Sequence, residues 1–190
     1  MEYEDILKII EENKKLLDHL KENFPIIKSI GEICSETIKN GGKIIVIGNG
    51  GSAAQAQHFS CELIVKMDRE REAMPCIALT SDSSIITAIS NDKDFKYVFS
   101  RQIEGLGKKG DVLFILSTSG NSENLIESAK KAKMKGIKIL SLLGKDGGKV
   151  KELSDIKYIV PSVNTQRIQE IHNLILHIIV QVIEDEFFRN

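Results

Sequence analysis

The fold is decided by residues 43–52, KIIVIGNGGS, in which an apolar run passes directly into a glycine-rich loop. A second stretch of the same design, VLFILSTSGNS at residues 112–122, follows later in the chain. In both, the apolar run predicts a buried strand, and the small residues predict a turn into a helix. Glycines let the backbone approach a ligand, and the first N–H groups of the helix point toward it. Each stretch therefore predicts an anion site at the end of a strand.

The second loop concentrates hydroxyl side chains: Ser117, Thr118, Ser119 and Ser122. Hydroxyl donors without a fixed positive charge suit a terminal phosphate ester that is held by hydrogen bonds and a helix N-terminus. An ordinary helix cap with a turn uses the same residue types, and it is the alternative for either loop alone. Two such loops in one strand–helix series favour a phosphorylated small molecule.

The bulk composition excludes several classes of protein. The 190 residues are 42% hydrophobic, which predicts one domain with a sizeable core. Twenty-six basic and 27 acidic residues give a net charge of −1, and this balance argues against a nucleic-acid or membrane partner. No membrane-spanning run or signal peptide is apparent. The three widely spaced cysteines, Cys34, Cys61 and Cys76, are interpreted as reduced core residues of a cytoplasmic protein.

Residues 1–40 form a helical lead-in. Apolar residues recur at helical spacing from Ile6 to Leu20, Pro25 marks a break, and a second helix is expected over residues 26–39, ended by Gly41-Gly42. The apolar stripe of this lead-in can lie on its own domain or on another subunit, and the pattern favours neither.

Residues 41–190 alternate between strands and helices and complete a single domain of 190 residues. Strands are predicted near residues 43–47, 76–79, 111–116, 137–142 and 156–160, and helices near residues 52–66, 83–91, 99–106, 122–135 and 165–187. The central strands are nearly continuous apolar runs, as a parallel sheet covered on both faces requires. The pattern predicts a doubly wound, three-layer α/β sandwich. Ligands of such folds bind at the carboxyl ends of the strands, where both loops fall.

Two predicted helices carry residues able to do chemistry. His58 and Glu62 lie four residues apart and therefore share one face of their helix. They can be interpreted as an acid–base pair, as two ligands to a divalent metal, or as partners in a surface hydrogen bond. On the last helix, His177 lies in an apolar stretch, so it is either a core residue or one that points into a site. Gln169 precedes it by eight residues, ~80° around the helix and ~12 Å along it, so only long side chains could meet.

Two further positions have alternative interpretations. Arg167 is a candidate partner for the phosphate or for a neighbouring glutamate. Asn91-Asp92 ends a predicted helix. The pair is either a simple stop signal for that helix or a contact to a sugar hydroxyl.

Five motifs together resemble the phosphoheptose isomerases of the sugar-isomerase (SIS) superfamily. They are GNGGS at residues 48–52, HFSCEL at 58–63, STSGNS at 117–122, LGKDGG at 143–148 and RIQEIH at 167–172. The resemblance covers essentially the whole chain. Single motifs are shared by many SIS domains, whereas their combination with His58, Glu62, Gln169 and His177 is far more specific.

The resemblance implies an aldose–ketose isomerase that works in a cytoplasmic homotetramer with active sites between subunits. It implies conversion of sedoheptulose 7-phosphate to D-glycero-D-manno-heptose 7-phosphate through an enediol, toward nucleotide-activated heptose for surface polysaccharide. A carboxylate and an imidazole suit the proton transfers. A divalent metal would polarise the carbonyl, although a ligated glutamate is a poorer base.

Residue roles carried over from the family fall into three groups. The acid–base pair is Glu62 and His177. The metal ligands, for zinc in the family, are His58, Glu62, Gln169 and His177. The substrate contacts are Asn49, Gly50, Gly51, Ser52, Glu62, Asn91, Asp92, Ser117, Thr118, Ser119, Ser122 and Gln169.

The chain departs from the family pattern at two positions. Lys66 falls in the segment where many members have Gly-Arg-Tyr, so a compact charge would have to replace a planar guanidinium. Gln166 stands where some relatives have an acidic residue.

Two other functions compete. A non-catalytic SIS protein that binds sugar phosphate or regulates replication would keep the fold, but it would lack residues equivalent to Glu62 and His177. A nicotinamide-dependent oxidoreductase would explain Gly48-x-Gly50-x-x-Ala53, but the expected acidic residue at the end of the second strand is absent.

Overall fold

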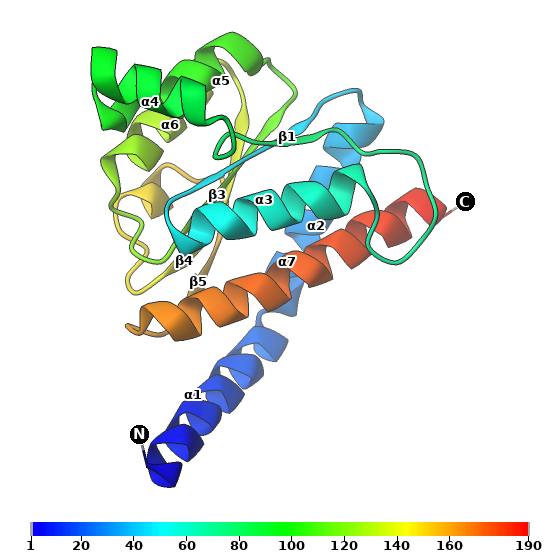
Figure 1. Ribbon diagram of the computed structural model, residues 1–190. Coiled ribbons are helices and arrows are strands. Elements are labelled where there is room, and N and C mark those ends of the chain that lie inside the picture. Colours follow the sequence, from blue (N-terminus) through cyan, green and yellow to red (C-terminus); the bar gives the residue numbers. More distant parts are fainter. Residues whose placement is uncertain (1, 190) are drawn as a thin grey trace.

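The computed structural model describes residues 2–189 and contains a five-stranded sheet at its centre (Figure 1). All strands are parallel, in the order β2-β1-β3-β4-β5. The strands are β1 (Ile44–Gly48), β2 (Cys76–Ala78), β3 (Val112–Ser117), β4 (Lys138–Gly144) and β5 (Ile156–Val160). The sheet reverses its direction of growth between β1 and β3, so the loops after these two strands flank the crevice where such folds bind ligands.

Helices cover both faces of the sheet, which confirms the predicted doubly wound sandwich. They are α1 (Tyr3–Glu22), α2 (Phe24–Lys39), α3 (Gly51–Ile64), α4 (Ser83–Asp92), α5 (Ser100–Leu106), α6 (Glu123–Met134) and α7 (Thr165–Phe188). Short 3₁₀ turns are η1 (Phe95–Tyr97) and η2 (Val150–Glu152). Alternate residues of the central strands serve opposite faces: Val46 packs toward α2, α3 and α7, whereas Ile47 packs toward α5 and α6.

The break between the first two helices lies earlier than the sequence pattern predicts. α1 ends at Glu22 and α2 begins at Phe24, which leaves Pro25 in the first turn of α2 rather than at the break. A proline is tolerated there because the N–H groups of a first helical turn have no intrahelical partner. The expected start of the second helix at Ile26 is therefore corrected by two residues.

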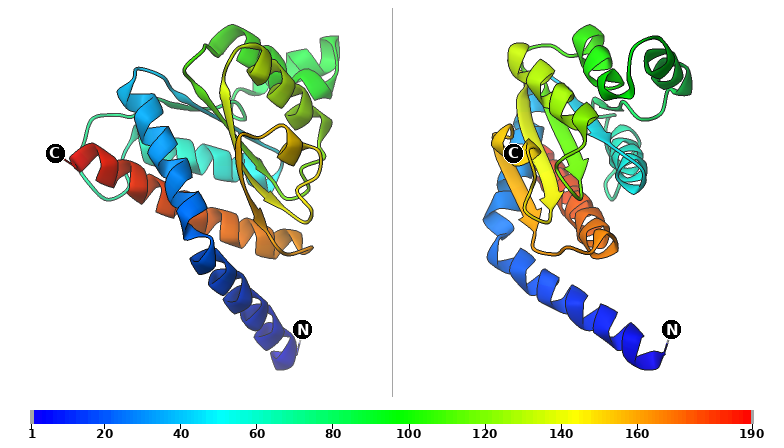
Figure 2. Two further views of the ribbon diagram at one scale, coloured as in Figure 1. Left: turned by 180° about the vertical axis from the view of Figure 1, so that it is seen from behind. Right: turned by 90° about the vertical axis from the view of Figure 1, so that its left-hand side faces the viewer.

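Helix α1 projects away from the layered body of the molecule (Figure 2). Only Leu16 and Leu20 of this helix are buried. Five large apolar side chains on it remain exposed: Tyr3, Ile6, Leu7, Ile10 and Leu17. Within residues 2–189, none of the helices is long and apolar enough to cross a membrane.

Candidate active site

The two loops singled out in the sequence meet in one cavity of about 300 Å³. No charged side chain is among the residues that line it: Asn49, Gly50, Gly51, Ser52, Leu116, Ser117, Thr118, Ser119, Ser122, Leu125, Thr165 and Gln169. The lining consists mainly of hydroxyls, amides and glycine backbone. Such a cavity can hold an anion only through hydrogen bonds and the two helix N-termini that open onto it.

The first loop brings backbone to the cavity. Gly50 caps α3 with φ +55°, a conformation that residues with a Cβ rarely adopt, and no side chain caps the first turn. The N–H groups of Ser52, Ala53 and Ala54 donate to the backbone carbonyls of Asn49 and Gly50, so the N–H of Gly51 is the first-turn donor left for a ligand. A Cβ on Gly51 would lie 2.6 Å from Nε2 of Gln169. Glycine at position 51 lets the amide group of Gln169, from α7, approach the start of α3 closely, and a larger residue there would make this side chain move.

The second loop presents its hydroxyls at the start of α6. Oγ of Ser117 accepts a hydrogen bond from the backbone N–H of Gly120 at 3.0 Å, and Oγ of Ser119 accepts one from Asn121 at 3.3 Å. Each hydroxyl thus shapes the loop through a lone pair and keeps its own hydrogen to donate. Ser122 is the N-cap of α6 but makes no capping bond, so its hydroxyl is available as well.

The backbone of the LGKDGG motif, residues 143–148, packs against the hydroxyl loop. A Cβ on Gly120, which has φ +62°, would overlap the carbonyl oxygen of Gly147, and one on Gly148 would overlap that of Ser119. The backbone N–H of Val150 also donates to the carbonyl of Gly120 at 2.9 Å. These close backbone contacts fix the shape of the loop, and they explain the glycines of both motifs.

An amide pair that the sequence analysis did not detect joins the two loops. Nδ2 of Asn49 donates to Oδ1 of Asn124 at 2.9 Å, and Nδ2 of Asn124 donates back at 2.8 Å. Asn124 is 2% exposed. The predicted substrate residue Asn49 thus lines the cavity, while its side-chain amide is hydrogen-bonded to Asn124 in the first turn of α6. No sequence signal distinguishes Asn124 from an ordinary residue of a helix first turn.

Helices α3 and α7 run side by side in the same direction (Figure 1). A second cluster of polar side chains lies on these two helices, farther from their N-termini than the cavity. Nε2 of His58 lies 2.8 Å from Nε2 of His177, and 3.6 Å from Oε1 of Glu62. The side chain of Glu62 is 18% exposed. The chain thus brings together the predicted carboxylate and both predicted histidines, and His177 points into this cluster rather than into the core.

The four predicted metal ligands are not all gathered in one place. His58, Glu62 and His177 form the cluster, whereas the side chain of Gln169 lies against Gly51 at the cavity. Over the described residues, no three His, Cys, Asp or Glu side chains stand close enough together to hold a metal ion. The donor chemistry nevertheless fits zinc, since two facing imidazole nitrogens and a carboxylate are ligands that this ion prefers.

Another histidine, His172, anchors α7 to the sheet. It is fully buried, and its Nε2 donates to the carbonyl oxygen of Leu143, at the end of β4, at 3.0 Å. Burial lowers the pKa of His172 to about 4, because the charged form is not solvated there. This neutral imidazole fixes α7 one turn beyond Gln169.

Other residues singled out in the sequence lie outside the cavity. Asn91 and Asp92 are exposed at the end of α4 and bond to each other at 2.8 Å, so their sugar contact stays a prediction. Arg167 pairs with Glu170, which confirms the glutamate interpretation; this ion pair lowers the pKa of the Glu170 carboxyl. Lys66 pairs with Glu70 at the surface and does not reach the cavity.

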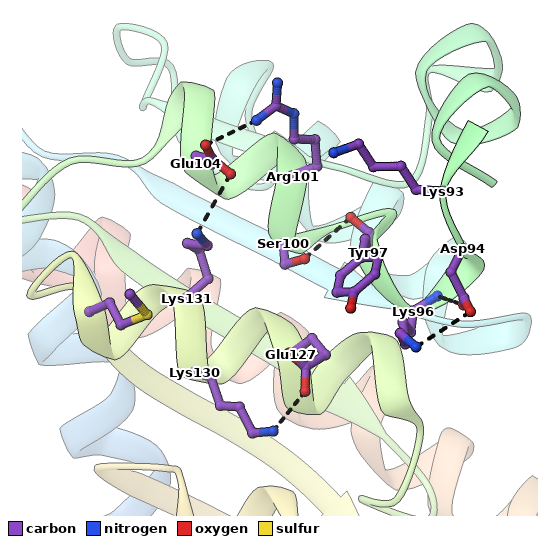
Figure 3. Close-up of a pocket in the computed structure, with 11 residues that line it drawn as sticks. Lys93, Asp94, Lys96, Tyr97, Ser100, Arg101, Glu104, Glu127, Lys130 and Lys131 are labelled. Atoms are coloured by element: carbon purple, nitrogen blue, oxygen red, sulfur yellow. Dashed lines mark hydrogen bonds and ion pairs between the residues drawn. The ribbon is translucent and has the colours of Figure 1, made fainter. Parts of the chain in front are cut away.

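A larger pocket of about 700 Å³ lies between η1, α5 and α6 (Figure 3). Its charged groups largely neutralise one another: Glu104 pairs with Arg101 and with Lys131, and Glu127 pairs with Lys130. None of the predicted site residues lines it. The predicted site residues therefore lie in the smaller cavity and in the His58–Glu62–His177 cluster, not in the larger pocket.

Comparison with known proteins agrees with this geometry. The family model described as the SIS domain matches residues 9–144. A phosphoheptose isomerase of a Nitratiruptor species is 47% identical over 185 residues, which cover 97% of this chain and 99% of that protein. One from Helicobacter pylori is 49% identical over 174 residues, or 92% and 89% of the two chains.

Solved structures give the same result. A phosphoheptose isomerase from Francisella tularensis superposes with a TM-score of 0.92 at 34% identity, covering 96% of this chain and 97% of its own. One from Neisseria gonorrhoeae gives 0.88 at 37% identity, with 96% and 98% covered. The fold and the hydroxyl-lined cavity thus define a sugar-isomerase domain of the SIS superfamily. Within this superfamily, the chain belongs to the phosphoheptose isomerase family.

Proposed function

We propose that this chain interconverts sedoheptulose 7-phosphate and D-glycero-D-manno-heptose 7-phosphate, moving the carbonyl from C2 to C1 through an enediol. One observation carries the proposal: an uncharged phosphate cavity and an imidazole–carboxylate cluster lie along the same pair of helices. His58 follows Ser52 by six residues, ~9 Å along α3. This separation suits a sugar chain with its phosphate at one end and its reacting carbons at the other.

The cavity would hold the phosphate. Hydroxyls of Ser119 and Ser122, together with N–H groups at the starts of α3 and α6, would donate to the phosphate oxygens. Because no lysine or arginine lines the cavity, binding relies on the number and direction of donors. The phosphate would then fix the position of the sugar chain against the helices.

The cluster would carry the proton transfers. Glu62 is the proposed base that removes a proton from C1 of the ketose, and His177 the proposed acid that protonates the carbonyl oxygen at C2. The resulting enediol gives the aldose when the proton returns to C2 and O1 loses its hydrogen. His58, within hydrogen-bond distance of His177, would orient its ring.

A divalent metal, with zinc the best match to the donors, is part of the proposal. His58, Glu62 and His177 would hold it once their side chains had drawn together around it, and Gln169 would join if its side chain left Gly51. When bound, the ion would supply a positive charge that polarises the carbonyl and stabilises the enediolate. Measuring turnover before and after chelation, with zinc content determined in parallel, distinguishes a catalytic metal from none.

We also propose a homotetramer that works in the cytoplasm on a small sugar phosphate, with no nucleic-acid or membrane partner. The exposed apolar face of α1 supports assembly, because isolated soluble chains rarely leave so much apolar surface in water. Three free cysteines support a reducing compartment, and although Cys34 and Cys76 are buried as expected, the expectation of a core position is wrong for Cys61, which is exposed on α3. Sites shared between subunits would give the exposed Asn91 and Asp92 a sugar to contact.

The test is product analysis by NMR after the purified chain is incubated with sedoheptulose 7-phosphate. Formation of the heptose 7-phosphate supports the proposal. No conversion with any added divalent metal would favour the non-catalytic sugar-phosphate-binding alternative, provided that the chain still binds the ligand.

A further inference from the structure

The loop between α3 and β2, residues 65–75, contains a buried arginine that none of the roles above uses. Figure 1 shows this loop arching past the C-terminal end of α7 before it returns to the sheet. Inside the arch, Nε of Arg71 donates to Oε1 of Glu184 on α7 at 2.9 Å. Both side chains are almost inaccessible, 5% exposed for Arg71 and 3% for Glu184.

The same guanidinium binds the end of α3. Its Nη2 donates to the backbone carbonyl of Glu62 at 2.7 Å, and its Nη1 donates to that of Leu63 at 2.8 Å. The last carbonyls of a helix have no intrahelical partner, and the last turn of α3 contains no basic residue of its own. Arg71 therefore supplies from the loop the positive charge that this helix end lacks, and it adds donors to the carbonyl of Glu62 and to that of Leu63, which also accepts from the backbone N–H of Met74 at 3.0 Å.

The pair also sets how the two helices lie against each other. Glu184 follows His177 by seven residues on α7, which places it on nearly the same face, ~10 Å farther along. Arg71 thus joins the peptide unit of Glu62 to the helix face that carries His177. The other end of this helix pair is fixed where Gln169 meets Gly51.

Stability alone does not account for this arrangement. A buried ion pair adds little net stability, because desolvation of both charges offsets their attraction. What it adds is direction, since a planar guanidinium with several fixed N–H groups fits only one placement of its acceptors.

We infer that Arg71 is a positioning residue for the isomerase reaction, which holds the last turn of α3 so that the carboxylate of Glu62 stays beside His58, in the cluster that contains His177. The inference rests on the proposed function. A displacement of about 1 Å at a reacting group can cost ~10²-fold in rate. Loss of the guanidinium therefore lowers kcat, whereas KM changes little because the phosphate cavity lies at the opposite end of α3.

The test compares Arg71→Met with a matched control, Arg69→Met. Arg69 lies two residues away in the same loop, pairs with Asp185 at 2.7 Å, and has a side chain 45% exposed. We expect Arg71→Met to lower kcat by about tenfold to a hundredfold with KM within about twofold, and Arg69→Met to leave both unchanged. Calorimetry should show unchanged binding of the sugar phosphate, and exchange of solvent deuterium into the substrate should slow in step with kcat.

A second variant covers the case in which Arg71→Met does not fold. Arg71→Lys keeps the charge beside Glu184 but cannot bridge two carbonyls, so it should fold and recover only part of kcat. Equal kcat values for the parent and a folded Arg71 variant would overturn the inference alone. A variant that changes only KM would also overturn it. A decrease in kcat that equals the fraction of unfolded protein would do the same. A parent that converts no sedoheptulose 7-phosphate would overturn the proposed function, and this inference with it.

Discussion

At the scale of single residues, the site depends on groups whose surroundings fix their state. His172 is buried and neutral, and its hydrogen bond from Nε2 to the carbonyl of Leu143 requires a proton on that nitrogen. Gly120 and Gly148 allow two backbones to meet where any side chain would separate them. Such residues determine where Gln169 and the hydroxyl loop lie.

The state of His172 predicts a pH dependence of stability. Its pKa falls from 6.5 in the unfolded chain to about 4 in the folded one. Between these values only the unfolded chain binds the proton, so the free energy of unfolding decreases as the pH falls through this window. Across the whole window His172 lowers the free energy of unfolding by roughly 3 kcal/mol, and above pH 6.5 it causes no such decrease.

Urea unfolding at pH 7 and pH 4.5 measures this effect. His172→Gln can still donate to Leu143 but does not titrate, so it should lose roughly 2 kcal/mol less than the parent over that interval. Equal losses in both proteins would show that His172 is protonated in the folded state.

At the scale of elements, the starts of α3 and α6 form the proposed phosphate cavity. Replacing Ser119 or Ser122 by Ala removes a hydroxyl donor to a charged oxygen, a bond worth roughly 1.5–3 kcal/mol. Each variant should therefore bind sedoheptulose 7-phosphate about tenfold to a hundredfold more weakly by calorimetry, with an unchanged fold. Thr87→Ala, which removes an exposed hydroxyl from α4, is the matched control. If both serine variants bound the substrate with the affinity of the parent, this loop would not be the phosphate site.

The elements also show what the sequence could and could not predict. Apolar runs and glycine-rich turns placed every strand and the α3 and α6 loops to within two residues, because burial and φ angles leave a direct mark on sequence. The imidazole of His177 could not be assigned, since a core histidine has the same sequence context. Asn124 and Arg71 were missed because their partners are distant in sequence, and only the packing of α3, α6 and α7 brings them together.

At the scale of the whole molecule, the exposed face of α1 is the proposed contact surface of the tetramer. Ile6 and Ile10 are 44% and 45% exposed, so burying the rest of each side chain contributes a little under half of the roughly 1.5–3 kcal/mol that full burial is worth. The double variant Ile6→Asp, Ile10→Asp should therefore dissociate at micromolar concentration, as measured by light scattering. Lys8→Asp adds a carboxylate at a position whose side chain is 75% exposed and should leave the assembly intact. A parent that is already monomeric and active would refute the tetramer.

The central claim is that Glu62 and His177 carry proton transfers on a sugar phosphate held at the far end of α3. It is tested most directly by turnover of sedoheptulose 7-phosphate in deuterated water, comparing the parent with Glu62→Gln and His177→Gln. Glu70→Gln, which replaces an exposed carboxylate of the neighbouring loop, is the control. The parent and the control should place deuterium at the product carbon next to the carbonyl. Both site variants should still bind the substrate but turn it over about 10²–10⁴-fold more slowly. Near-parental turnover by Glu62→Gln would contradict the account.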